Sequence, residues 1–249
     1  MPDYFSTQSA NYSKNRPTYP DELFVFLNSL CYDHKLAWDC ATGNGQCAIS
    51  LAQYFKTVYA TDLSEVQISN SFKRPNIIYK VEEAEKASLS NHSADLITVA
   101  TGIHWFDIPA FYKEVQRILK PGGILAVWGY GGCTINPEID VIINRFSFET
   151  LKEYWPPETK LNWQDKYKTL PFPYPLIDVP VFQAKANQDL NDFISYMNSW
   201  SAVQVYIKKH AVNPVDKIAL ALKELWSEES LSRTITWDLF FKCGKNSPT

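Results

Sequence analysis

The stretch that decides the fold is Asp39-Cys40-Ala41-Thr42-Gly43-Asn44-Gly45-Gln46-Cys47-Ala48, which stands between an apolar segment at 36–40 and a helical pattern at 46–55. Two of the nine glycines of the chain fall in this stretch. Glycine is needed where φ is positive or where the backbone must approach a ligand closely. A turn from a strand into a helix also presents backbone N–H groups and the positive end of the helix dipole. The stretch therefore predicts a ligand site.

Strands and helices alternate on both sides of this turn, as far as about residue 130. We expect strands at 36–40, 57–61, 77–81, 94–100 and 124–128, and helices at 21–30, 46–55, 64–72 and 109–119. Ser64 is the expected N-cap of its helix. This alternation is typical of an α/β fold with a doubly wound, mostly parallel sheet and helices on both faces. Right-handed crossovers place the ligand crevice of such a sheet at the carboxyl ends of the strands.

The alternation ends after residue 133. Six of the fifteen prolines lie from Pro156 to Pro180, a density that argues against a long helix or a central strand. We expect helices at 138–153, 189–210 and 214–226 and a late antiparallel strand pair at 181–186 and 233–243, which makes seven strands. The expected organisation is one domain over 1–249, with an N-terminal lid and helix at 1–30, a cofactor-binding core at 31–132, a helical, proline-rich substrate cap with one late strand at 133–231, and a final strand and tail at 232–249.

The composition excludes several classes of protein. Of 249 residues, 45% are hydrophobic and 20% charged, which argues against a disordered chain or a coiled coil. Lys plus Arg number 24 and Asp plus Glu 27, so the net charge of −3 offers no basic excess for nucleic acid. No apolar run approaches the roughly 20 residues that span a bilayer, and residues 1–20 lack the apolar centre of a signal peptide. Five cysteines without a C-x-x-C pair predict neither disulfides nor a metal site. A cytoplasmic monomer is the resulting expectation.

Carboxylates follow the first three expected strands. The glycine stretch fits the dinucleotide pattern G-x-G-x-x-G/A, with Ala48 in the third position. Asp62 lies nineteen residues after Gly43 and closes the second strand, where a carboxylate can hold a ribose diol. Asp39 places a negative charge beside the turn, which suits a cofactor with an ammonium group and disfavours a pyrophosphate. The run 83–85 follows the third strand, where an adenine amine could be bound.

At this point the chain resembles a known family. Its residues 35–130 carry, in order and spacing, motifs similar to those of class I S-adenosylmethionine (SAM) methyltransferases, namely Asp39 to Gly45, Thr61-Asp62-Leu63-Ser64, Ala84-Glu85 and Leu119-Lys120-Pro121-Gly122-Gly123. Other segments resemble the type 11 branch related to trans-aconitate methyltransferase, namely Phe5-Ser6 with Tyr12, Arg16-Pro17 with Tyr19-Pro20, His104-Trp105-Phe106-Asp107 and Trp200-Ser201-Ala202-Val203-Gln204. The resemblance implies the Rossmann-like class I methyltransferase fold. The first motif of the family usually contains more glycine; here Ala41 and Asn44 occupy variable places and the spacing is kept.

Carried over position by position, the resemblance implies a set of site residues. Those expected to bind the cofactor SAM, which leaves as S-adenosylhomocysteine, are Tyr12, Arg16, Asp39, Thr42, Gly43, Asn44, Gly45, Asp62, Leu63, Glu83, Ala84, Glu85, Thr101 and Trp105. Tyr12 and Arg16 would belong to the lid, and Trp105 and Trp200 would meet the acceptor substrate. His104 is the candidate general base, since histidine titrates near neutrality. Plainer interpretations stay open. His104 and Trp200 could only pack against their neighbours, and Glu83 and Glu85 could belong to a solvated surface.

The implied activity is SAM-dependent methyl transfer to a small-molecule acceptor by in-line displacement. Most of the catalytic work would then be to hold the acceptor atom about 3–3.5 Å from the methyl carbon and to exclude water. A carboxylate acceptor needs no base, whereas an alcohol or a phenol does. Because no residue is an unambiguous base, the sequence favours a carboxylate or another oxygen that is already nucleophilic. Two alternatives remain: an NAD-dependent oxidoreductase, on the G-x-G-x-x-A pattern, and a SAM-binding protein without turnover.

Overall fold

The computed structural model describes residues 17–247. A seven-stranded sheet runs through it in the order β3-β2-β1-β4-β5-β7-β6. The strands are β1 (Leu36–Cys40), β2 (Thr57–Asp62), β3 (Ile77–Val81), β4 (Ala94–Ala100), β5 (Leu119–Tyr130), β6 (Gln183–Gln188) and β7 (Arg233–Lys245). Neighbours from β3 to β5 pair in parallel, and β7 pairs antiparallel with both β5 and β6. This arrangement confirms the predicted mostly parallel sheet with a late antiparallel pair.

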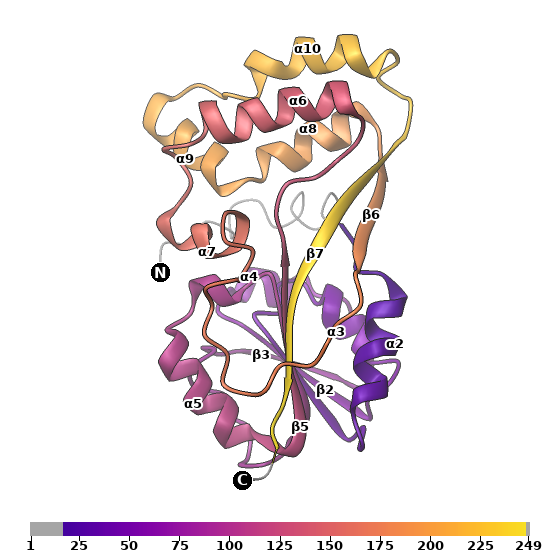
Figure 1. Ribbon diagram of the computed structural model, residues 1–249, viewed down its shortest axis with the longest axis vertical. Helices are drawn as coiled ribbons and strands as arrows, with labels where there is room; N and C mark the ends of the chain where they lie inside the picture. The colour runs from indigo at the N-terminus through magenta and orange to yellow at the C-terminus, as the bar shows by residue number, and fades with distance from the viewer. Residues whose placement is uncertain (1–16, 248–249) are drawn as a thin grey trace.

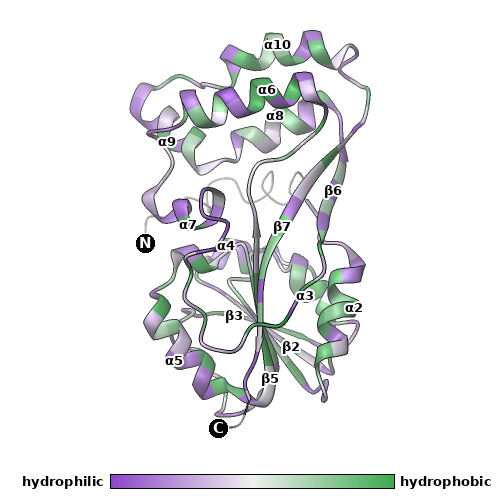
Figure 2. Cartoon of the chain, in the orientation of Figure 1, coloured by the Kyte–Doolittle hydropathy of each residue, from purple (hydrophilic) through white to green (hydrophobic). Residues whose placement is uncertain are grey.

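Helices cover both faces of the parallel part of the sheet (Figure 1). On one face, α2 (Asp21–Leu30) and α3 (Gln46–Leu51) pack against alternate residues of the strands, among them Ala37, Val58 and Leu96. On the other face, α5 (Ile108–Ile118) packs against the intervening residues, such as Trp38, Ile97 and Val127. The central strands β1 and β4 are mostly apolar and buried, whereas the helices mix apolar and polar residues (Figure 2). Strands buried on both faces have this composition, which is why the sequence shows them as short apolar runs.

A second layer of helices stands beyond the carboxyl ends of the parallel strands (Figure 1). We call it the cap; its helices are α6 (Pro137–Arg145), α8 (Leu190–Asn198), α9 (Ser201–His210) and α10 (Asp216–Trp226). The cap has its own apolar core, which includes Ile139, Phe193, Met197, Trp226 and Trp237. Because Trp237 lies in β7, the same strand contributes to the cap core and to the sheet.

Several expected boundaries differ from the observed ones. The helix expected at 46–55 ends at Leu51, and the one expected at 64–72 is α4 (Glu65–Ser69), with Ser64 capping it by accepting the N–H of Gln67. The helix expected at 138–153 is α6 followed by a π-helical turn, Phe146–Thr150.

The expected helix 189–210 is two helices, because the chain turns at Ser199 and Trp200 between α8 and α9. The remaining short elements are the 3₁₀ turns η2 (Ile103–Trp105) and η4 (Pro157–Thr159) and the single-turn helix α7 (Lys160–Trp163). η4 and α7 fall in the proline-rich segment, where no long element was expected.

Candidate active site

The glycine turn between β1 and α3 is open on its outer side. Gly43 has φ +56°, and a Cβ built on it would meet no atom within 4 Å. Gly45 has φ +88°, and a Cβ there would lie 2.2 Å from the Tyr79 hydroxyl oxygen. Gly45 is therefore required by packing as well as by conformation, whereas the backbone of Gly43 is accessible to a ligand. The N–H of Thr42 donates to the carbonyl of Thr61 at 2.8 Å, which fixes the turn to β2.

Two residues that are not glycine share the left-handed region at this edge of the sheet. Ala41, after β1, has φ +54°, and Thr101, after β4, has φ +60°. The loops touch: a Cβ built on Gly102 would lie 2.8 Å from the Ala41 Cβ. Left-handed φ at such residues costs free energy and is concentrated at functional sites. The strain therefore marks the carboxyl ends of β1 and β4 as the place where the backbone is shaped for a ligand.

Asp39 lies behind the turn instead of on its open side. Its side chain has no exposed surface, and its two oxygens accept the hydroxyls of Thr42 at 2.5 Å and Thr98 at 2.8 Å. Burial raises the pKa of this carboxyl above its usual value, and the two hydroxyl hydrogen bonds oppose that rise. Asp39 thus holds the turn against β4 from beneath. The sequence analysis expected it to meet the cofactor, and the structure shows its hydrogen bonds going to protein groups.

Asp62, at the end of β2, joins two loops at the crevice. Its carboxylate accepts the N–H of Gly43 at 2.8 Å and that of Ser64 at 2.9 Å. The side chain of Leu63 is 52% exposed beside it. A carboxylate held by two backbone donors is charge-assisted and well oriented, and an exposed apolar side chain next to it offers a flat contact. The Asp62 carboxylate could accept hydrogen bonds from a ribose diol, and the Leu63 side chain could pack against the base attached to that ribose.

The segment after β3 closes the far side of the crevice. Ala84 is buried, and Glu85 accepts the N–H of Asp107 at 2.9 Å, which connects this segment to the start of α5. Glu83 forms an isolated β-bridge with Lys86, so the segment turns back on itself. The backbone around Ala84 is therefore fixed at the crevice rather than being part of a solvated run.

These loops enclose a cavity of about 680 Å³, which we call the main cavity. Ten of the expected cofactor residues line it: Thr42, Gly43, Asn44, Asp62, Leu63, Glu83, Ala84, Glu85, Thr101 and Trp105. Asp39 and Gly45 stand behind this wall, and Tyr12 and Arg16 lie outside the described residues. Five carboxylates and no Lys or Arg from residues 17–247 line the cavity. Its negative potential favours a cationic ligand and disfavours a pyrophosphate.

Tyr19 is a cavity residue that the sequence analysis did not single out. Its hydroxyl lies 3.2 Å from the Thr101 hydroxyl, and its ring meets Trp128 edge-on at 5.5 Å between centroids. Both contacts are far away in the sequence, so no local pattern could have revealed them. The only signal was its place in the segment that resembles the type 11 branch.

A smaller cavity of about 120 Å³, which we call the chamber, adjoins the main cavity beneath the cap. Thr101, Trp105 and Tyr130 line both cavities. The rest of the chamber wall combines aromatic and neutral polar side chains, including His104, Asn144, Phe148, Trp155, Asn162, Tyr196 and Trp200. The expected substrate residues Trp105 and Trp200, which lie far apart in the sequence, thus share one cavity.

Trp200 is packed as well as facing the chamber. Its side chain is almost fully buried, and its ring lies within 5.8 to 6.3 Å of the rings of Tyr196, Trp155 and Phe146. The packing interpretation therefore agrees with the structure, and the contact of Trp200 with the acceptor stays a prediction.

His104 faces the chamber with an unusual environment. Its Nδ1 lies 3.3 Å from the Tyr167 hydroxyl oxygen, and its ring centroid is 5.0 Å from that of Trp105. Burial lowers the pKa of the imidazole to about 3, because the charged form loses hydration there. An imidazole with such a pKa is neutral near pH 7 and is a weak base. The expectation that His104 acts as a general base stays a prediction, and this environment disfavours it.

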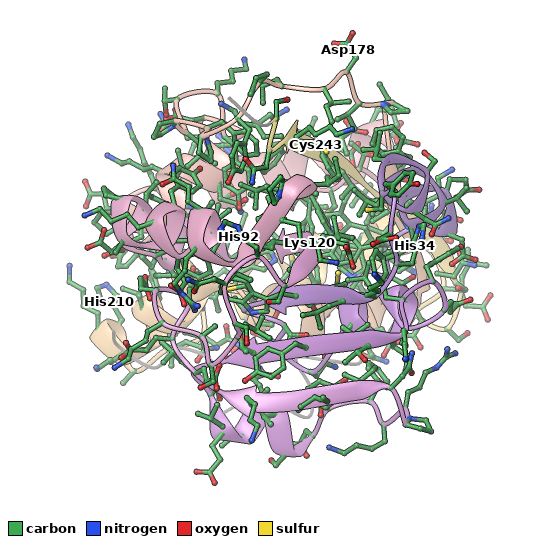
Figure 3. The ribbon with its side chains drawn as sticks, turned by 90° about the horizontal axis from the view of Figure 1, so that it is seen from below. His34, His92, Lys120, Asp178, His210 and Cys243 are labelled. Atoms are coloured by element: carbon green, nitrogen blue, oxygen red, sulfur yellow. The ribbon has the colours of Figure 1, made fainter. Side chains whose placement is uncertain are left out.

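Between residues 17 and 247, no three His, Cys, Asp or Glu side chains gather where they could hold a metal ion. His34, His92 and His210 lie well apart from one another (Figure 3). In that same part of the chain, no helix is both long and apolar enough to cross a membrane.

Comparisons with known proteins agree with this geometry. A family model described as a methyltransferase domain matches residues 38–127. A protein of Dictyostelium discoideum described as a methyltransferase is 37% identical over 210 residues, which are 83% of this chain and 80% of that protein. The structure of a protein of Anaeromyxobacter dehalogenans, described as a type II methyltransferase, is 32% identical, covers 94% of this chain and 99% of its own, and superposes with a TM-score of 0.86.

A more distant structure shows the same fold. Phosphoethanolamine N-methyltransferase 2 of Haemonchus contortus, in complex with S-adenosylhomocysteine, is 16% identical, covers 100% of this chain and 58% of its own, and has a TM-score of 0.51. The narrower resemblance to trans-aconitate methyltransferases stays a prediction. The sheet order, the turn after β1 and the two close relatives lead to one conclusion: this chain belongs to the class I SAM-dependent methyltransferases.

Proposed function

We propose that this enzyme transfers a methyl group from SAM to an oxygen of a small-molecule acceptor, an oxygen that is already nucleophilic when it binds, such as a carboxylate. The observation that carries the proposal is the pair of cavities that meet at Thr101, Trp105 and Tyr130. A volume of about 680 Å³ lies within the roughly 300–1,000 Å³ usual for cofactor sites. The smaller chamber then offers a place for the acceptor next to the cofactor.

The residues of the main cavity fit SAM. Asp62 would accept from the ribose hydroxyls, Leu63 would lie against the adenine, and the backbone of Ala84 would meet the adenine edge. The backbone at Gly43 would approach the methionine portion, because no side chain stands in the way. When bound, SAM supplies a methyl group on a positively charged sulfur that is a good leaving group. The acidic lining of the cavity suits this cation.

The chamber suits a compact acceptor. An apolar protein cavity of about 150 Å³ is known to hold benzene, so 120 Å³ corresponds to an acceptor portion no larger than about one ring. Its aromatic walls would exclude water and hold the acceptor in line with the methyl carbon, which is where most of the rate enhancement of such a transfer arises. His104 is a weak base in this environment. An acceptor that needs no deprotonation is therefore favoured over an alcohol.

Binding and turnover together test the proposal. We expect titration calorimetry to show binding of S-adenosylhomocysteine and no heat with NADH. Labelled SAM should then transfer its methyl group to members of a panel of small carboxylic acids, while neutral alcohols of the same size stay unlabelled. Transfer to alcohols or amines alone would refute the choice of acceptor. Binding of SAM without transfer to any extract fraction or panel member would favour the non-catalytic alternative.

The organisation of the chain follows from the same proposal. Residues 31–132 would bind the cofactor, residues 133–231 would cap the acceptor, residues 1–30 would form the lid and residues 232–249 the final strand and tail. The enzyme would act as a cytoplasmic monomer on a free metabolite. Light scattering after size exclusion tests the monomer: a mass near 28.6 kDa is expected, and twice that value would contradict it.

A further inference from the structure

We propose that Tyr167 is a positioning residue that fixes the tautomer of His104, so that the imidazole presents an N–H donor, on Nε2, to the acceptor chamber. The contact behind this proposal joins the Tyr167 hydroxyl and His104 Nδ1 across 3.3 Å. Tyr167 lies within the proline-rich segment and has no motif of its own. It contacts neither the main cavity nor the chamber directly.

The backbone is strained at the point that places this tyrosine. Lys166 and Tyr167 are consecutive residues with φ +50° and +57°, a conformation that side-chain-bearing residues rarely adopt once and more rarely twice in a row. The turn directs the Tyr167 ring into the core under α5, where it has no exposed surface and meets Phe240 edge-on at 4.9 Å. Strain that persists in a folded protein is usually retained for a local purpose. Here it delivers one hydroxyl to one imidazole nitrogen.

The direction of the hydrogen bond follows from the two partners. The Tyr167 hydroxyl has no hydrogen-bond partner within residues 17–247 other than His104. If Nδ1–H donated to the phenol oxygen, the buried phenol hydrogen would be left without an acceptor, which costs free energy. If the phenol donates to an unprotonated Nδ1, the buried phenol hydrogen is satisfied, and the N–H of the imidazole is on Nε2. An imidazole nitrogen is also a better acceptor than a phenol oxygen, and a phenol is a stronger acid than an imidazole N–H.

The charge states of His104 and Tyr167 agree with this direction of the hydrogen bond. Burial lowers the pKa of His104 to about 3 and raises that of the Tyr167 phenol far above its usual value. Both groups are thus neutral near pH 7, and a neutral imidazole carries one N–H. With Nδ1 accepting from Tyr167, that proton resides on Nε2. Nε2 has no protein partner in the described part of the chain, while His104 itself lines the chamber.

The consequence for the acceptor rests on the proposed function. An N–H donor beside Trp105 would bind a carbonyl or carboxylate oxygen of the acceptor and would orient the neighbouring oxygen toward the methyl carbon. His104 would then select acceptors that carry a hydrogen-bond-accepting oxygen, and it would not remove a proton. The carboxylate or oxo group of the acceptor would satisfy a donor that the protein itself leaves open.

The tautomer can be measured without knowing the acceptor. The full chain, labelled uniformly with ¹⁵N, has only four histidines, and His104→Gln identifies the resonances of His104 in two-bond ¹H–¹⁵N spectra. At pH 7 we expect Nδ1 at the shift of an unprotonated ring nitrogen and Nε2 at that of a protonated one. The opposite pattern, or the pattern of an imidazolium, would overturn the proposal. This measurement on the unmodified protein stands even if a variant fails to fold.

A matched pair of variants tests the role of the tyrosine. Tyr167→Phe keeps the buried ring and removes only the hydroxyl, so we expect the two nitrogen shifts of His104 to move toward each other as the tautomers mix. Tyr112→Phe is the control, because its hydroxyl donates to the carbonyl of Pro171 in the same loop at 2.6 Å and does not reach His104. Tyr167→Phe spectra identical to those of the unmodified protein would show that the hydroxyl has no positioning role.

The same samples separate this inference from the proposed function. S-adenosylhomocysteine binding, measured by calorimetry on each variant, reports the main cavity alone. Normal binding with the wrong tautomer would refute the role of Tyr167 and leave the methyltransferase proposal intact. The expected tautomer in a protein that binds no S-adenosylhomocysteine would refute the proposed function and leave the role of Tyr167 intact.

Discussion

Replacing Asp62 by Ala perturbs two functions of one carboxylate. It removes the acceptor of the Gly43 and Ser64 N–H groups and the proposed partner of the ribose diol. Hydrogen bonds to a charged group contribute about 1.5–3 kcal/mol each. Because the two N–H groups are only partly buried, water can solvate them in the free variant. We therefore assign the loss of binding to the ribose contact and expect about 2–3 kcal/mol. At about 1.4 kcal/mol per factor of ten, this corresponds to a roughly 30- to 150-fold weaker affinity for S-adenosylhomocysteine.

The assay is titration calorimetry at fixed pH and ionic strength, with a control of equal charge. Asp178→Ala changes the net charge in the same way but lies on an exposed loop, where its side chain points away from the protein (Figure 3). We expect Asp178→Ala to bind like the unmodified chain. Asp62→Asn should fall in between, because its amide oxygen can still accept one hydrogen bond but the charge is gone. An unchanged affinity for Asp62→Ala, or an equal loss for Asp178→Ala, would refute the proposed ribose contact.

Three further changes test other parts of the site. Gly45→Ala places a Cβ against the partly buried ring of Tyr79 at positive φ, so urea unfolding should show at least about 1–2 kcal/mol of destabilisation, while Gly132→Ala, which meets no atom within 4 Å, should cost far less. Equal costs would contradict the steric explanation. Thr98→Val removes a hydroxyl that donates to the buried Asp39 carboxyl and should destabilise the chain by about 1–3 kcal/mol; a neutral result would contradict a stabilising role for this hydrogen bond. The pKa of His104 is lower in the folded chain than in the unfolded chain, so the unfolded chain binds more protons than the folded chain below about pH 6.5. The free energy of unfolding should therefore decrease as the pH is lowered from about 6 to 4. His104→Gln should flatten that slope in urea unfolding, and an unaltered slope would contradict the shift.

The sequence predicted the parallel core well because the signals there are local. β1, β2 and β4 are short apolar runs buried on both faces, and the residues expected at their carboxyl ends are in place, such as Gly43 after β1 and Asp62 as the last residue of β2. Helix ends were less well predicted. The segment 189–210 has an unbroken helical pattern, yet the chain turns at Trp200, whose indole packs among three aromatic rings of the cap. Tertiary packing overrides helical propensity at that point.

The candidate site was predicted in part, for reasons that differ between its members. Residues expected to act through their backbone position, such as Gly43 and Ala84, line the main cavity, in agreement with their predicted places after β1 and β3. The direction of a side chain does not: Asp39 turns inward to Thr98, and only the three-dimensional arrangement reveals it. Tyr19 and Tyr167 reach their partners across 82 and 63 residues, and no periodicity in the sequence encodes such contacts.

Because the long strand β7 belongs to both the sheet and the cap, the cap helices could be exchanged while the sheet is kept. The chain leaves the sheet after Tyr130 and returns to it along β7, and the two paths are joined by reciprocal backbone hydrogen bonds of 2.9 Å between Thr134 and Thr236. Because these hydrogen bonds fix the distance between entry and exit, the cap helices α6, α8, α9 and α10 could change in length or shape while the lining of the main cavity, which ends at Tyr130, is left as it is. The residues from Tyr167 to Phe182 would have to be kept, since they pack into the two cores on the faces of the sheet. New acceptor preferences could then evolve, or be engineered, by changes in the cap helices alone.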